Sequence, residues 1–163
     1  MGKNRTCAAV ESATHHPSPI THHAGSETIL AFDYGKRYVG VAVGDTAVGV
    51  AHPLATIDAA GAARRFAAIA EFVREWRPAR IVVGLPLSPE GGEQELTGQV
   101  RRFARQLEAR FGLPIAFQDE RLSSAEAASR LRAIGRGGRR NKVLTHPVAA
   151  LVVLQSYLDE SAR

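Results

Sequence analysis

The sequence predicts an α/β fold, a five-stranded mixed sheet with helices on both of its faces. Three observations indicate it: successive short apolar runs early in the chain, a helical period after them, and two further apolar runs that alternate with helical segments. Strands linked by short turns pair antiparallel, whereas strands linked by a helix run parallel, so the sheet is mixed. The 163 residues suffice for one domain with a real hydrophobic core.

Three strands are expected first. Residues 28–33 and 38–43 form a hairpin around a short turn, and residues 47–57 form a third strand that is interrupted near Pro53. In the second strand alternate valines face one side of the sheet. The opposite side carries small residues, where another element could approach closely. These small residues are Gly40, Ala42 and Gly44.

The remaining elements alternate between helix and strand. They are expected over residues 66–76, 80–86, 100–111, 113–120, 123–135 and 147–158. Ser123 and Glu126 form a capping box at the start of the third helix, and Gly135 would end it. Pro147 is expected near the first turn of the last helix, where proline is tolerated.

Composition indicates a basic globular protein. The net charge of +5 and the pI near 10.0 suggest an anionic partner, most often nucleic acid. Cys7 is the only cysteine, which excludes a disulfide or a cysteine zinc site within one chain and fits a reducing cytoplasm. No apolar run approaches the ~20 residues of a membrane span, and the N-terminus lacks the apolar section of a signal peptide.

Residues 1–27 are expected to form a disordered tail, and residues 28–163 to form the folded domain. The tail is rich in small and polar residues and has no apolar period. Four histidines in it could ligate a metal, but a flexible polar tail is the favoured interpretation. An over-long start site is the other interpretation of this segment.

Carboxylates close two of the predicted strands. Asp33 ends the first, Asp119 and Glu120 end the fifth, and residues 84–86 end the fourth. If these strands are parallel neighbours, their ends share the edge at which open α/β sheets bind ligands. Carboxylates so close together stay ionised only around a cation. Oxygen ligands suit Mg²⁺ or Mn²⁺, which can promote phosphodiester hydrolysis.

Each acid also has a simpler interpretation when it is taken alone. An Asp-x-Gly sequence after a strand, as at Asp33, commonly forms a tight turn. Asp119 stands two residues before Arg121 and could form a surface ion pair with it. A functional role therefore depends on the acids being brought together by the topology.

Four motifs in order resemble the YqgF family: "AFDYGKRYVGVAVGD", "IVVGLPLSPEGGEQ", "DERLSS" and "AALVVLQSYL". The resemblance runs from about Ile29 to Leu158. The family consists of small bacterial proteins related to Holliday junction resolvases and assigned to nuclease processing of pre-16S ribosomal RNA. The resemblance implies a ribonuclease-H-like fold and phosphodiester hydrolysis that depends on a divalent metal.

The resemblance also implies catalytic and metal-binding residues. Asp33 matches the first metal-binding aspartate of the family, and Glu120 matches the second acid. The third acid normally stands at the start of the last helix, where this chain has His146, and no carboxylate lies between Glu126 and Asp159. His146 is expected either to ligate the metal, which favours Mn²⁺ over Mg²⁺, or to cap the helix while the third ligand is lost.

A basic segment follows the second acid. Residues 121–142 contain seven cationic residues and one acid. A glycine-rich basic loop of this kind could follow a nucleic-acid backbone, although a solvated loop is the alternative. Cations near the acids are also candidates, because they follow the first predicted turn. The candidate nucleic-acid contacts are Lys36, Arg37, Arg121, Arg136, Arg139, Arg140 and Lys142.

These features favour a metal-dependent nuclease that acts in maturation of the 5′ end of pre-16S rRNA. The alternatives are a resolvase of branched DNA and a non-catalytic nucleic-acid-binding or ribosome-assembly protein. A phosphate-binding domain of the actin and sugar-kinase kind is disfavoured, because such proteins need two domains. The expected partner is nucleic acid, either pre-rRNA or branched DNA, and the ribosome is a further candidate. No membrane partner is expected. The chain is expected to be a cytoplasmic monomer or weak homodimer.

Overall fold

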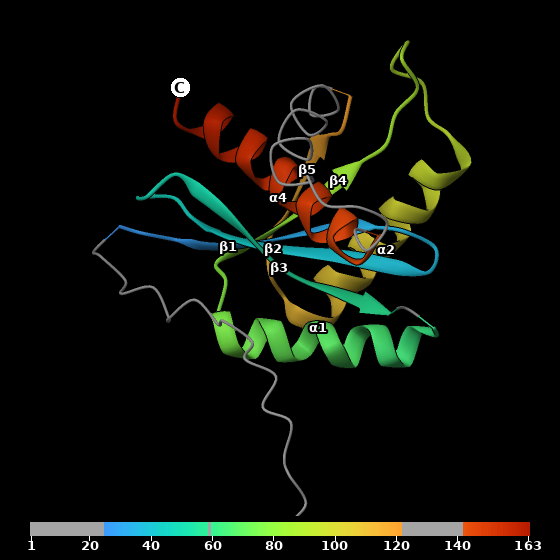
Figure 1. The fold of residues 1–163 in the computed structure, drawn as a ribbon, viewed down its shortest axis with the longest axis horizontal. Coiled ribbons are helices and arrows are strands. Elements are labelled where there is room, and N and C mark those ends of the chain that lie inside the picture. The colour runs from blue at the N-terminus through green and yellow to red at the C-terminus, as the bar shows by residue number, and fades with distance from the viewer. Residues whose placement is uncertain (1–24, 59, 122–141) are drawn as a thin grey trace, which may run out of the picture.

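The computed structural model describes residues 25–58, 60–121 and 142–163 (Figure 1). Five strands form one sheet in the order β3-β2-β1-β4-β5. The elements are β1 (Thr28–Tyr34), β2 (Tyr38–Asp45), β3 (Val50–Asp58), α1 (Ala62–Trp76), β4 (Arg80–Leu85), α2 (Glu95–Phe111), β5 (Ile115–Asp119) and α4 (Lys142–Ser161). The helix expected over 123–135, with its capping residues, lies outside the described residues.

The strand directions follow the connections, as the sequence predicts. β1 pairs antiparallel with β2, and β2 pairs antiparallel with β3. β1 pairs parallel with β4, and β4 pairs parallel with β5. The carboxyl ends of β1, β4 and β5 therefore lie at one edge of the sheet, which we call the acidic edge.

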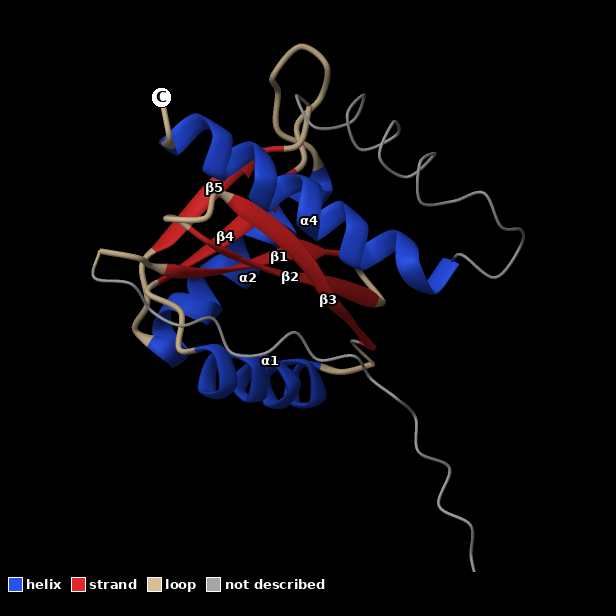
Figure 2. Cartoon of the chain, turned by 60° about the vertical axis from the view of Figure 1, so that its left-hand side comes forward, coloured by secondary structure: helices blue, strands red, loops and turns tan. Residues whose placement is uncertain are grey.

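Helices cover both faces of the sheet (Figures 1 and 2). Leu30 and Phe32 of β1 belong to the core under α1 and α2, whereas Ile29 and Ala31 belong to the core under α4. Because successive side chains of a strand point to opposite faces, Asp33 lies on the α4 face. The next residue, Tyr34, packs against the α1 and α2 core on the other face.

The glycines of β2 let α4 lie directly on the sheet, as the sequence predicts for this small face. A Cβ atom at Gly40 would lie 1.9 Å from the backbone oxygen of His146. A Cβ atom at Gly44 would lie 3.0 Å from Cδ1 of Leu158. Two points of β2 thus hold the N-terminal and C-terminal parts of α4 at a close distance.

β3 begins three residues later than predicted, because residues 46–49 belong to a turn. Oδ1 of Asp45 accepts hydrogen bonds from the backbone N–H groups of Ala47 at 2.8 Å and Val48 at 3.3 Å. The predicted interruption near Pro53 is a shift of register between β2 and β3. A proline is accommodated there because β3 is an edge strand.

The prediction for the start of α4 was wrong. The helix begins at Lys142, and Pro147 lies inside it rather than in its first turn. Proline inside a helix removes one backbone hydrogen bond, and the backbone of the residue before it, His146, packs closely on Gly40. Across the described ranges, no helical segment combines the length and apolar character that a bilayer-spanning helix needs.

Candidate active site

Glu120 reaches Asp33 from the end of β5, two strands away in the sheet. The backbone N–H of Glu120 donates to the carbonyl of Leu85 at 3.2 Å, which extends the pairing of β4 and β5 by one step. The side chains of Glu120 and Asp33 are hydrogen-bonded to each other. The structure therefore brings these two predicted site residues together at the acidic edge.

Gly84 makes the space in which the Glu120 carboxyl group lies. A Cβ atom at Gly84 would lie 2.3 Å from Oε1 of Glu120 and 3.0 Å from Cγ2 of Val153. Any other residue at this position would displace the carboxyl group or α4. The sequence places Gly84 at the end of a strand but does not reveal this role, and an isolated glycine in a strand is the signal for such a close approach.

The two carboxyl groups share an environment that opposes charge. Burial, together with the negative charges of Asp33 and Asp119 and the hydrogen bond to Asp33, raises the pKa of Glu120 to about 8. Burial also raises the pKa of Asp33, while its hydrogen bond to Glu120 and the charge of His146 act in the opposite direction. Both effects make it unfavourable for the two carboxyl groups to be ionised at the same time.

His146 approaches the same site from α4. Its ring lies 5.2 Å from the ring of Tyr38, measured between centroids, and its charge influences Asp33. The main chain of His146 is fixed by its contact with Gly40. Within the described ranges, however, no three His, Cys, Asp or Glu side chains come close enough to form a metal-binding group. Ligation by His146 thus stays a prediction.

Comparison with known proteins identifies the family. The family model RuvX, described as Holliday junction resolvase, matches residues 27–160. The chain belongs to the RuvX family. A relative from Methylobacillus flagellatus is 49% identical over 143 residues, 88% of this chain and 97% of the relative. One from Chromobacterium violaceum is 48% identical over 132 residues, 80% of this chain and 96% of the relative. Both relatives bear the name "Putative pre-16S rRNA nuclease".

Solved structures show the fold of this RuvX-family chain. RuvC of T. thermophilus in complex with a Holliday junction substrate aligns with a TM-score of 0.55 at 16% identity, over 83% of this chain and 96% of that one. The Fowlpox virus resolvase in complex with Holliday junction DNA aligns with a TM-score of 0.55 at 10% identity, over 83% and 99%. The predicted ribonuclease-H-like fold and the resemblance to the YqgF family are confirmed.

Arg121 lies next to the acids but is engaged by Asp119. Its Nη2 lies 2.6 Å from Oδ2 of Asp119, and hydrogen bonds from Arg121 hold the pKa of Asp119 below its usual value. Nη1 also donates to the carbonyl of Pro89 at 3.4 Å. Asp119 thus forms the surface ion pair that the sequence suggested, and its carboxylate is turned to Arg121 rather than to Asp33.

The other predicted nucleic-acid contacts are only partly described. Lys36 and Arg37 are exposed in the turn between β1 and β2. Nζ of Lys36 lies 3.9 Å from Oε1 of Glu95, and the guanidinium of Arg37 lies 5.2 Å from the centre of the Tyr38 ring. Outside the described residues lie Arg136, Arg139 and Arg140. Lys142 begins α4.

Proposed function

We propose that this RuvX-family chain is a nuclease that hydrolyses phosphodiesters of structured nucleic acid with a divalent cation held by Asp33 and Glu120. One observation carries the proposal: two partly buried carboxyl groups from separate strand ends share a hydrogen bond and have raised pKa values. The name borne by the curated relatives supports a more specific role. That role is maturation of the 5′ end of pre-16S rRNA.

The residues at the acidic edge fit a divalent cation. Carboxylate oxygens are the ligands that Mg²⁺ and Mn²⁺ take in proteins. A dication would offset the burial and the negative charge of Asp33 that together raise the pKa of Glu120. A divalent ion supplies Lewis acidity, which activates an attacking water and stabilises the leaving oxygen of the phosphodiester. Strand ends and the contact at Gly84 keep both ligands rigid.

We propose His146 as a third ligand through a neutral imidazole nitrogen. The influence of His146 on Asp33 and its fixed backbone support this role. Imidazole binds Mn²⁺ more readily than Mg²⁺, so Mn²⁺ is the expected ion when His146 ligates. If His146 only stabilises the packing of α4, the cleavage rates in Mg²⁺ and in Mn²⁺ should be equal. They should also stay equal in His146→Ala.

A cleavage assay tests the proposal directly. An RNA fragment that spans the 5′ precursor boundary of 16S rRNA is incubated with wild type, Asp33→Asn or Glu120→Gln in Mn²⁺ or Mg²⁺. The expected result is cleavage by wild type alone, with Mn²⁺ more effective than Mg²⁺. Binding of the RNA without any cleavage that depends on Asp33 would instead favour the non-catalytic ribosome-assembly protein.

A second candidate function is resolution of branched DNA. The description of the matched family and the fold shared with resolvases favour it. A four-way DNA junction in the same assay separates the two functions, because faster cleavage of the junction than of the RNA would contradict the rRNA role. Junction cleavage at two symmetric positions would also require a dimer, whereas the rRNA role fits a monomer or weak homodimer in the cytoplasm, in contact with the ribosome.

A further inference from the structure

A basic hollow lies between α1 and α2, on the face of the sheet opposite the acids. Its volume is about 390 Å³. Polar and charged side chains dominate its lining, together with the ring that ends β1. We call this site the basic hollow; its lining residues are Tyr34, Ala62, Arg65, Gln99, Arg102, Phe103 and Gln106. Nothing in the proposed hydrolytic chemistry uses them.

The hollow opens at the same edge of the sheet as the acids. Tyr34 follows Asp33 directly in β1 and points to the opposite face, where it packs in the core of α1 and α2. α1 follows β3, whose last residue pairs with Tyr38 at this edge. α2 follows β4, whose carboxyl end also lies there. A strand of nucleic acid that crosses this edge would meet both sites.

The lining of the hollow selects an anion. It contains two arginines and two amides but no carboxylate. The guanidinium of Arg65 lies 5.1 Å from the centre of the Tyr34 ring, which holds its charge at the sheet edge. The first residue of α1, Ala62, also lines the hollow, and the first turn of α1 contains no acid. The partial positive charge of a helix N-terminus adds to the two guanidinium charges.

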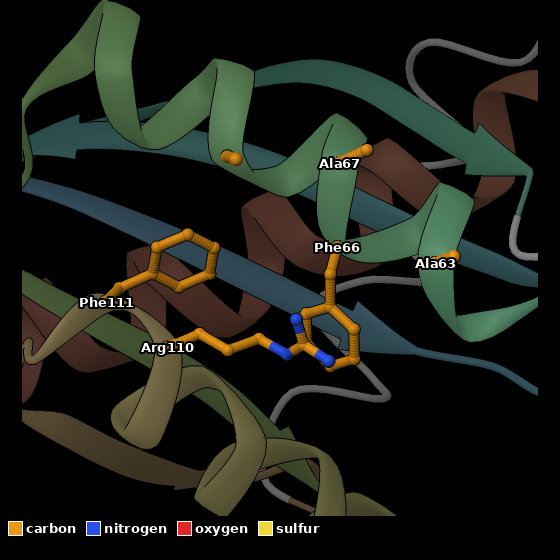
Figure 3. Close-up of a pocket in the computed structure, with 6 residues that line it drawn as sticks. Ala63, Phe66, Ala67, Arg110 and Phe111 are labelled. Atoms are coloured by element: carbon orange, nitrogen blue, oxygen red, sulfur yellow. The ribbon is translucent and has the colours of Figure 1, made fainter.

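A second hollow between the same helices provides a contrast (Figure 3). Alanines and the rings of Phe66 and Phe111 line it, and Arg110 is its one charged residue. The guanidinium of Arg110 lies over the Phe66 ring, 4.2 Å from its centre. An arginine over an aromatic ring therefore occurs in both hollows, but only the basic hollow adds a second cation and hydrogen-bonding amides.

We propose that the basic hollow binds a backbone phosphate of the nucleic-acid substrate, on the far side of β1 from the phosphate that is cleaved. Arg65 and Arg102 supply charge, and Gln99 and Gln106 supply amide N–H donors. The inference rests on the proposed nuclease function. Phosphate groups occur at every nucleotide, so this contact sets the path of the strand rather than its sequence.

The test measures binding separately from cleavage. Anisotropy of labelled RNA and of a labelled four-way junction is titrated in EDTA, which prevents hydrolysis, at several KCl concentrations. Arg102→Gln and the double variant Arg65→Gln/Arg102→Gln are compared with the matched control Arg110→Gln. The double variant is expected to bind about tenfold more weakly and to lose ~0.7–0.9 of salt slope for each phosphate contact. The control is expected to bind as wild type does.

Two further measurements separate the hollow from its alternatives. Arg65→Lys/Arg102→Lys keeps the charge and should recover part of the lost affinity, with melting temperatures confirming that each variant folds. Single methylphosphonates placed along the strand should weaken wild-type binding at one position, and this sensitivity should vanish in the double variant.

Unchanged affinity and salt slope in the double variant would overturn the inference. A second outcome would also overturn it: inorganic phosphate raises the melting temperature of wild type alone, while all variants bind nucleic acid equally well. The hollow would then bind small anions only. Asp33→Asn leaves both arginines of the hollow in place and is assayed separately for cleavage in Mn²⁺. Retained cleavage in that variant would contradict the proposed nuclease function, not the phosphate site.

Discussion

Asp33 and Asp45 are both carboxylates near the ends of apolar strands, but their surroundings differ. Asp45 lies at the opposite edge of the sheet from Asp33 and is 1% exposed. It accepts hydrogen bonds from two backbone N–H groups and from the hydroxyl of Ser26. Asp33 instead faces another carboxyl group, that of Glu120.

The difference separates a structural carboxylate from a candidate ligand. Hydrogen-bond donors compensate the burial of Asp45, so its charge stabilises the turn after β2. Asp33 and Glu120 have raised pKa values because burial disfavours their charged forms, and for Glu120 the charge of Asp33 adds to this effect. A dication is the simplest partner that would compensate both groups at once.

Substitution of each aspartate separately gives the largest expected effects, on cleavage for Asp33 and on stability for Asp45. Asp33→Asn should lower cleavage at least about 100-fold while the protein stays folded, because it removes a negative charge from a repulsive pair. Asp45→Ala should lower the free energy of unfolding by about 1–3 kcal/mol, since buried N–H groups lose their acceptor. Cleavage rates per folded molecule and urea denaturation measure the two effects. Equal loss of cleavage in both variants would remove the distinction.

A substitution at Gly84 tests whether cleavage depends on the position of the Glu120 carboxyl group. Gly84→Ala should lower cleavage about 100-fold, because a Cβ atom 2.3 Å from Oε1 displaces the carboxyl group. Gly98→Ala in α2 is the matched control: apart from the adjacent backbone of its own helix, nothing lies within 4 Å of its added Cβ, and alanine stabilises a helix by about 0.5–1 kcal/mol relative to glycine. Wild-type cleavage in Gly84→Ala would show that the Glu120 carboxyl group need not lie there.

The pH dependence of stability reports on the same pair. The folded pKa of Glu120, about 8, lies above its ordinary value of 4.5, so the folded protein binds a proton more tightly than the unfolded chain does. The contribution of Glu120 to the stability of the metal-free protein should therefore be greatest below pH 4.5 and should fall as pH rises to about 8. Thermal melts in EDTA measure this fall, which should be smaller in Glu120→Gln.

A divalent cation should act most strongly at the upper end of that range. Mn²⁺ competes with the proton on Glu120, so the rise in melting temperature caused by Mn²⁺ should grow between pH 6 and pH 8. An increase that does not depend on pH, or that is unchanged in Glu120→Gln, would place the ion elsewhere.

The smallest expected effect belongs to Asp119, the third carboxylate near a strand end. It forms an ion pair with Arg121 at the surface, and such pairs contribute about 0–1 kcal/mol. Asp119→Asn should therefore change the free energy of unfolding by less than about 1 kcal/mol and leave cleavage within about twofold of wild type. Urea denaturation and initial cleavage rates check both, and a loss as large as that of Asp33→Asn would make Asp119 part of the site.

The sequence predicted the sheet and its acidic edge because alternation of strand and helix dictates parallel neighbours. It also predicted the small face of β2 from the alternation around Gly40. It did not predict the role of Gly84, since a glycine in a strand does not show which side chain approaches it. The start of α4 was missed because Pro147 is compatible with a first turn, whereas the helix begins five residues before it.

A crystal soaked in MnCl₂ tests the central claim most directly. Anomalous difference density should show one Mn²⁺ bound by carboxylate oxygens of both Asp33 and Glu120, and a ligating His146 would add a nitrogen. The absence of density between these carboxyl groups at saturating Mn²⁺, with both side chains still hydrogen-bonded to each other, would contradict the account.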